Sequence, residues 1–262
     1  MTATVSAVKS VNTTELEQKL KEMYQQVAQD PHGEFHFELG HGLAERLGYA
    51  GADLDRIPRE AIDSFAGVGY YFDLATLASG EAVLDLGSGS GMDTFIAALK
   101  VGAGGNVRGV DMTDAQLAKA GQLCARDDIR NVSYHKAYIE HTPFAPASFD
   151  CVISNGVINL AADKAAVFRE AARVLKPGGR LAISDIISEK ELPEGVTCNA
   201  TLWAACIGGA LQQDRYLDAI SAAGLKVATV RENSQYRFLT PQAQKACATY
   251  GVKSVSILAH KG

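Results

Sequence analysis

Val-Leu-Asp-Leu-Gly-Ser-Gly-Ser-Gly, residues 83–91, is the stretch that decides the fold of this chain. The apolar run over 82–86 has the character of a buried parallel strand, and it breaks into glycines at alternate positions. Glycine lets a ligand approach the main chain closely. A second strand-like run follows and ends at Asp111, whose carboxylate can accept both hydroxyls of a ribose. This layout predicts a nucleotide-type cofactor site on an α/β sheet.

The spacing of the glycines indicates which cofactor binds. A dinucleotide fingerprint, G-x-G-x-x-G, would put its third glycine where this chain has Met92. The observed pattern is D-x-G-x-G-x-G, and its Asp85 would repel a pyrophosphate but suits a cofactor with a cationic amino-acid end. The stretch resembles motif I of the class I S-adenosylmethionine-dependent methyltransferases, and Asp111 resembles their ribose-binding acid.

The composition is that of a globular protein and disfavours several partners. Apolar residues make up 47% and charged residues 21%, which permits a sizeable core. The net charge of −5, without a basic block, disfavours a nucleic-acid partner. No apolar run reaches the ~18 residues of a membrane span, and the first residues do not resemble a signal peptide. The five cysteines form no CxxC, so we expect no metal site, no disulfide framework and a cytoplasmic location.

Strand-like and helix-like segments alternate from residue 82 onward. The predicted strands cover 82–86, 106–110, 132–136, 149–154, 180–184, 225–231 and 253–260. This alternation predicts a Rossmann-like, doubly wound, mostly parallel seven-stranded sheet. The last two strands show no clear helix between them, so we expect them to pair antiparallel.

The domain organisation is predicted to have two parts. Residues 1–80 form a helical or irregular N-terminal cap or lid, and residues 81–262 form the cofactor-binding α/β domain with an acceptor-side insertion at about 186–213. The cap starts with an amphipathic helix, where Thr14 and Glu17 match a capping box. We expect this helix to pack on the domain surface, and the alternative is a lid over the active site.

The predicted cofactor site gathers the carboxyl ends of four strands, where ligands bind in open α/β sheets. The glycine loop would receive the amino-acid portion, Asp111 the ribose, and Met112 and Ile139 the adenine, with Glu140 or the adjacent backbone at its amino group. The fourth strand would end at the reacting centre. The predicted cofactor-binding residues are Asp85, Gly87, Ser88, Gly89, Gly91, Asp111, Met112, Ile139, Glu140 and Asn155.

Further motifs resemble those of one branch of this class, the arsenite methyltransferases. They are Gly-Val-Asp-Met-Thr (109–113), Val-Ile-Ser-Asn-Gly-Val-Ile-Asn-Leu (152–160), Arg-Val-Leu-Lys-Pro-Gly-Gly (173–179) and Cys-Ile-Gly-Gly-Ala-Leu (206–211). The resemblance spans about residues 35–260. It implies an enzyme that takes S-adenosyl-L-methionine as methyl donor and releases S-adenosyl-L-homocysteine, acting as a monomer or a homodimer.

The departures from that branch concern the methyl acceptor. The family binds trivalent arsenic through three cysteine thiolates, and the matching positions here are Val68, Gly156 and Cys206. One thiolate is a poor cage for arsenic. We therefore expect another small-molecule acceptor. Two alternatives stay open: arsenite held by Cys206 and an unexpected partner, or a cofactor-binding protein without transfer activity that serves regulation or assembly.

Candidate acceptor-side residues lie in the cap segments and at the fourth strand end. Methyl transfer from a sulfonium is an in-line displacement, so the protein mainly aligns donor and acceptor. We hypothesise a pocket that is aromatic where relatives use thiolates, walled by residues such as Trp203, with a base available if the acceptor carries a proton. The candidate catalytic residues are Tyr70, Tyr71, His36, Asn155 and Cys206.

Overall fold

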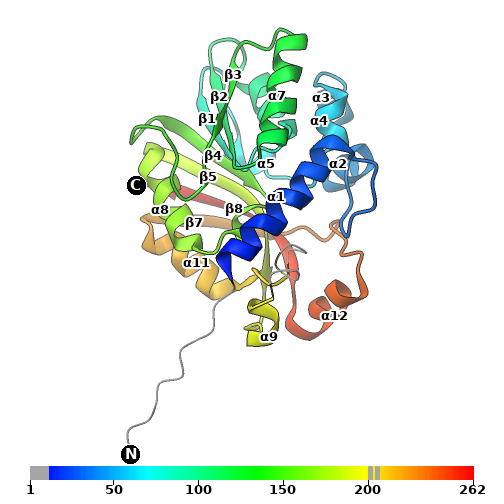
Figure 1. Ribbon diagram of the computed structural model, residues 1–262. Helices are drawn as coiled ribbons and strands as arrows, with labels where there is room; N and C mark the ends of the chain where they lie inside the picture. Colours follow the sequence, from blue (N-terminus) through cyan, green and yellow to red (C-terminus); the bar gives the residue numbers. More distant parts are fainter. Residues whose placement is uncertain (1–11, 200–202, 204–206) are drawn as a thin grey trace, which may run out of the picture.

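The apolar runs of the sequence form the strands of an eight-stranded sheet in the computed structural model, which describes residues 12–199, 203 and 207–262 (Figure 1). All seven predicted strands are present. The strands are β1 (Ala82–Leu86), β2 (Asn106–Asp111), β3 (Val132–Lys136), β4 (Phe149–Asn155), β5 (Leu175–Ser188), β6 (Leu211–Gln212), β7 (Leu225–Glu232) and β8 (Lys253–Lys261).

The strand order is β3-β2-β1-β4-β5-β8-β7, with β6 pairing with β5 off this path. Strands β1 to β5 are parallel to one another. Strand β8 is antiparallel to both β5 and β7. The order reverses between β1 and β4, and in open α/β sheets the ligand site lies at such a reversal. The antiparallel pairing of the last two strands is confirmed.

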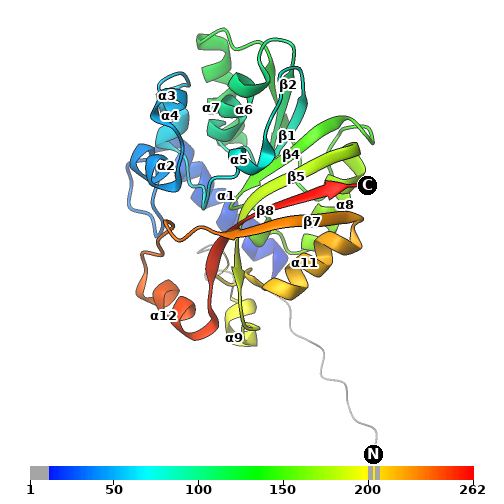
Figure 2. The same cartoon turned by 180° about the vertical axis from the view of Figure 1, so that it is seen from behind.

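Helices cover both faces of the sheet (Figures 1 and 2). Alternate strand residues point to opposite faces, so Val83 packs into one core with α6 and the cap helices, and Leu84 packs into the other with α8 and α11. The described helices are α1 (Thr13–Gln29), α2 (His41–Leu47), α3 (Gly51–Leu54), α4 (Arg59–Asp63), α5 (Phe72–Ala75), α6 (Met92–Val101), α7 (Asp114–Arg126), the 3₁₀ helix η1 (Ile158–Leu160), α8 (Lys164–Val174), α9 (Glu194–Thr197), α11 (Gln213–Ala222) and α12 (Pro241–Tyr250).

Three details differ from the sequence-based expectation. Helix α12 lies between β7 and β8, where no helix was predicted; its start carries an N-cap, Thr240, followed by a proline at the first helical position. Strand β5 begins at Leu175, before a register shift against β4. The first helix is capped by Asn12, whose side chain accepts the Glu15 N–H at 3.2 Å, so the predicted capping box at Thr14 is wrong.

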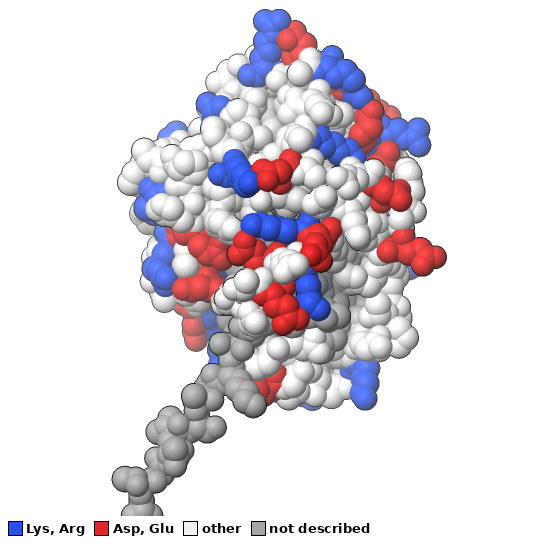
Figure 3. Space-filling model, in the orientation of Figure 1, with Lys and Arg blue, Asp and Glu red and all other residues white. Residues whose placement is uncertain are grey.

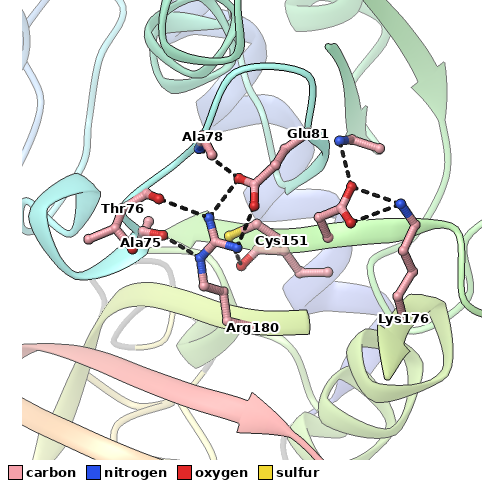
Figure 4. Close-up of polar contacts among 10 residues, drawn as sticks. Ala75, Thr76, Ala78, Glu81, Cys151, Lys176 and Arg180 are labelled. Carbon is pink, nitrogen blue, oxygen red and sulfur yellow. Dashed lines mark hydrogen bonds and ion pairs between the residues drawn. The ribbon is translucent and has the colours of Figure 1, made fainter. Parts of the chain in front are cut away.

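A partly buried ion pair ties the end of the cap to the amino-terminal edge of the sheet (Figure 4). Arg180 of β5 donates to both carboxylate oxygens of Glu81 at 2.9 and 2.7 Å, and to the carbonyls of Ala75 and Thr76 just after α5. Cys151 lies beside it with no exposed surface, and burial raises the pKa of its thiol to about 12.

We expect Arg180→Met to lower the free energy of unfolding by about 2–4 kcal/mol, because it strands the carboxylate of Glu81 with little solvent. Denaturant unfolding monitored by circular dichroism measures this loss. The matched control is Arg169→Met, since Arg169 pairs with Asp163 at 3.7 Å and both side chains are more than 60% exposed. That change should stay within about 0.5 kcal/mol, and equal losses for the two variants would contradict the assignment.

Candidate cofactor and acceptor site

The glycine loop between β1 and α6 adopts the left-handed backbone that only glycine takes without strain. The φ angles of Gly87, Gly89 and Gly91 are 73°, 52° and 96°. Space is short as well: a Cβ on Gly87 would lie 2.5 Å from the Val157 side chain, and one on Gly91 2.1 Å from the Tyr134 hydroxyl. The loop therefore needs its glycines both for its turn and for packing against neighbouring strands.

Asp111 at the end of β2 holds this loop in place. Its carboxylate accepts the N–H of Gly89 at 3.0 Å and the N–H of Thr113 at 2.8 Å. Burial raises the pKa of Asp111, and the backbone N–H groups act in the opposite direction by stabilising the charged form. The ribose acid predicted from the sequence is thus fixed by main-chain donors next to the glycine loop.

All ten predicted cofactor-binding residues line one cavity at the carboxyl ends of the parallel strands. Helix α1 forms another wall of this cavity through Thr13, Leu16, Glu17, Leu20 and Tyr24. The first helix therefore lies against the site, in keeping with the lid alternative, and does more than pack on the domain surface. The assignment of 1–80 as a cap or lid domain stays a prediction.

Polar contacts hold α1 over the cavity. The Tyr138 hydroxyl, in the loop after β3, donates to Glu17 at 2.6 Å and accepts from Lys21 at 3.1 Å. The side-chain amide of Gln116, from α7, donates to the Tyr24 carbonyl at 2.9 Å. Thr113, the N-cap residue of α7, makes no side-chain capping bond. Figure 3 shows acidic and basic side chains side by side on the face that carries α1.

Two buried carboxylates flank the glycine loop. Asp85 in β1 is 2% exposed and accepts the Thr94 hydroxyl at 2.6 Å; burial, together with the nearby charge of Asp93, raises its pKa to about 8. Asp93 in α6 accepts the hydroxyls of Tyr49 at 2.6 Å and Tyr71 at 2.8 Å and the Asn155 amide at 3.0 Å. Burial raises the pKa of Asp93 as well, against the effect of these three donors.

Asn155 at the end of β4 clamps the backbone of the cap segment 67–69. Its side-chain oxygen accepts the N–H of Val68 at 2.8 Å and that of Gly69 at 3.3 Å, and its amide donates to the Gly69 carbonyl at 3.0 Å. A Cβ on Gly67 would lie 2.7 Å from the Asn155 amide nitrogen. The segment is thus held close against the strand end at the edge of the cavity.

The described residues that line the cavity carry negative charge only. Five carboxylates line it, and no Lys, Arg or His is among the described lining residues. Nor does any described Lys, Arg or His form an ion pair with the three acids nearest the loop. Buried charges are normally paired, so this cavity is suited to a ligand that brings positive charge. The five acids are Glu17, Asp85, Asp93, Asp111 and Glu140.

The acceptor-side candidates are placed differently from the cofactor residues. Among them, Asn155 lines the cavity, and Cys206 lies outside the described residues. Tyr71 is fully buried, Tyr70 packs edge-on against Tyr49, and His36 packs on Phe37; none of the three lines the cavity.

The aromatic residues that line the cavity differ from those predicted from the sequence. Trp203 is buried, donates to the Thr197 carbonyl at 2.6 Å and does not line the cavity. The aromatic rings that line it belong to Tyr24, Phe65 and Tyr138. Sequence reasoning also missed Asp93, because an acid in the first turn of a helix is common for electrostatic reasons alone.

The two positions that match arsenic-binding cysteines in the resemblance lie face to face. A Cβ on Gly156 would be 3.1 Å from a methyl carbon of Val68. Val68 is 1% exposed and belongs to an apolar cluster with Leu160 and Trp203. The edge of the cavity is therefore apolar where this chain carries valine and glycine.

The fold and site together define a class: a doubly wound sheet with a glycine loop, a fixed acid at the end of β2 and a cavity suited to a cationic ligand. Residues 77–224 match the family model described as a methyltransferase domain. The chain therefore belongs to this family and carries a class I S-adenosylmethionine-dependent methyltransferase domain, which confirms the fold class and cofactor predicted from the sequence.

The curated relatives of this chain include arsenite methyltransferases. The chain is 40% identical over 187 residues to that of Halobacterium salinarum, covering 71% of this chain and 48% of the relative. It is 46% identical over 142 residues to that of Aquipseudomonas alcaligenes, covering 52% and 41%. It thus spans less than half the length of these curated relatives.

A solved structure of a related protein shares the architecture. The arsenic(III) S-adenosylmethionine methyltransferase of Chlamydomonas reinhardtii superposes with a TM-score of 0.67 at 34% identity, covering 80% of this chain and 71% of that one. In the described part of this chain, no helix has both the length and the apolar character needed to cross a membrane.

Proposed function

We propose that this protein transfers a methyl group from S-adenosylmethionine to a small, uncharged acceptor. The charge of the cavity lining supports the proposal, because five carboxylates line it without a basic residue among the described lining positions. An acceptor with a phosphate or carboxylate would find no basic partner among the described lining residues. The walls contributed by Leu20, Phe65 and Leu160 favour an apolar molecule.

The residues of the chain would act mainly by binding and orientation. When bound, S-adenosylmethionine supplies an activated methyl group on a sulfonium sulfur. The glycine loop and Asp111 would hold its amino-acid and ribose portions, and Ile139 and Glu140 would flank its adenine. Helix α1 would exclude water from the cavity, and Asn155 would fix the segment 67–69 beside the acceptor. Such alignment can account for ~7–11 kcal/mol of the barrier.

A thiolate-bound arsenic acceptor of the family type is disfavoured in this proposal. Val68 and Gly156 face each other beside the cavity, which Gly156 lines and Val68 does not, and neither residue offers a ligand atom for a soft metalloid. Arsenite remains the second candidate acceptor, because the curated relatives carry the name arsenite methyltransferase. It would then rely on Cys206 and an additional ligand.

A donor-turnover assay with a panel of acceptors tests the proposal. The panel pairs neutral thiols and phenols with anionic analogues of the same size, and adds arsenite with a reducing thiol; mass spectrometry identifies the methylated product. Turnover of neutral members with at least about 10-fold lower rates for the anionic analogues is expected.

Each other outcome of the assay contradicts a stated part of the proposal. Equal turnover of charged and neutral analogues would refute the acceptor class. Methylated arsenic that disappears in Cys206→Ala would favour the second candidate. Binding of S-adenosylhomocysteine without turnover of any acceptor would favour a regulatory or assembly protein.

A further inference from the structure

Two buried acids, Asp85 and Asp93, and the partly buried Asp111 surround the glycine loop, and none of them pairs with a Lys, Arg or His that the structure describes. Asp111 is satisfied by two backbone N–H groups beside the loop. Asp85 lies at the end of β1, directly before the loop. Asp93 lies in the first turn of α6 and is hydrogen-bonded to Asn155, at the end of the neighbouring strand β4. The three acids therefore line the cavity from three different elements, β1, α6 and β2.

Asp93 lies between the glycine loop and the acceptor-side segment 67–69. On one side is the glycine loop, which is predicted to receive the amino-acid portion of the cofactor. On the other side is Asn155, which clamps the acceptor-side segment 67–69. In S-adenosylmethionine the sulfonium sulfur follows the amino-acid portion and carries the methyl group that must point toward the acceptor. A cofactor bound with its amino-acid portion at the glycine loop would therefore bring its positively charged sulfur close to Asp93, which lines the cavity.

The hydrogen bonds of Asp93 suit it to meet a positive charge. Both of its carboxylate oxygens accept bonds from buried donors, Tyr49 on one oxygen and Tyr71 with Asn155 on the other. These donors stabilise the ionised form and fix its orientation, although burial alone would favour the neutral acid. The carboxylate is 6% exposed and lines the cavity, so a bound ligand would find it already oriented.

We infer that Asp93 is a specificity-determining residue that makes the site prefer the sulfonium of S-adenosylmethionine over the neutral thioether of S-adenosylhomocysteine, whereas Asp85 serves the α-ammonium that both carry. This inference rests on the proposed methyl transfer. Transfer moves the methyl group to the acceptor and leaves the bonding electron pair on sulfur, which removes the positive charge. The product thus loses one of its two attractive contacts, and this favours its release.

Isothermal titration calorimetry with three ligands tests the inference without any acceptor. The ligands are S-adenosylmethionine, S-adenosylhomocysteine and sinefungin, whose amine carries a positive charge in place of the sulfonium. Asp93→Asn should weaken binding of the two charged ligands by about 10-fold, and of S-adenosylhomocysteine by less than about 3-fold. The matched variant Asp85→Asn should weaken all three by similar factors.

The outcomes distinguish a role of Asp93 in specificity from a purely structural role, and they distinguish failure of this inference from failure of the proposed function. Equal losses for all three ligands in Asp93→Asn, or no loss, would overturn the inference. A wild-type protein that binds none of the ligands would instead refute the cofactor site. If thermal unfolding shows that Asp93→Asn is not folded, the pH dependence of the wild-type affinities gives the same information.

The pH experiment predicts the direction in which the ratio of the two affinities changes. Acidification protonates Asp93, whose carboxylate faces Tyr49, Tyr71, Asn155 and the nearby Asp85. The preference for S-adenosylmethionine over S-adenosylhomocysteine should therefore fall as the pH is lowered. Loss of Asp85 charge affects both ligands alike and cancels in the ratio. A ratio independent of pH would overturn the inference.

Discussion

Asp111→Ala should weaken binding of S-adenosylhomocysteine by about 100-fold, the combined effect of losing charge-assisted hydrogen bonds to a ligand and the anchor of the loop. The carboxylate accepts the N–H groups of Gly89 and Thr113, so its removal frees the glycine loop as well as the ribose-binding position. Calorimetry with S-adenosylhomocysteine measures the effect directly and needs no acceptor.

The control for this experiment is three residues further along the chain. Asp114 is 79% exposed and pairs with Lys136 at 2.7 Å on the surface. Asp114→Ala should change the affinity by less than about 2-fold, because exposed ion pairs contribute little. An Asp111→Ala variant that is folded and binds as tightly as the wild type would remove the ribose assignment.

The double substitution Val68→Cys with Gly156→Cys should create an arsenite site that the parent lacks. A Cβ at position 156 would lie 3.1 Å from a Val68 methyl carbon, so two thiolates placed there can reach one arsenic atom. Two linked ligands bind more tightly than one, and we expect about 100-fold tighter binding of arsenite than in Val68→Cys alone. Calorimetry in the presence of a monothiol reductant measures this difference.

Backbone strain at position 156 requires a matched control. Gly156 has a φ of 70°, so any side chain there is strained. The pair Val68→Ser with Gly156→Ser has the same strain and nearly the same size but no thiolate, and it should bind no arsenite. If the cysteine and serine pairs behave alike, these positions are not the ligand positions implied by the resemblance.

The cofactor half of the site was predictable because its chemistry depends on local sequence. A glycine loop forms where the chain needs left-handed backbone, and Asp111 follows at a distance fixed by one helix and one strand. Both signals lie within residues 83–111. The other predicted residues, Ile139, Glu140 and Asn155, were expected from the ends of two further strands, and all ten line one cavity.

The acceptor half was harder to predict because it depends on tertiary placement. Tyr70 and Tyr71 follow the 67–69 segment in sequence, yet Tyr71 turns into the core toward Asp93 and Tyr70 packs on Tyr49. Helix α12 was also missed, since its alanine-rich sequence has only a weak apolar stripe, and packing rather than periodicity defines it.

The clamp on residues 67–69 has a consequence for how this site can change over evolutionary time. Both side chains that hold Val68 contact its main chain. Asn155 accepts the Val68 N–H, and the Ser254 hydroxyl donates to the Val68 carbonyl at 2.6 Å. Every amino acid except proline offers these same two groups. The hydrogen bonds that hold the backbone of this segment therefore do not depend on the side chain at position 68. A lineage can exchange the chemistry at this position for another side chain of similar size while the backbone geometry is kept, because the side chain itself is buried among apolar neighbours.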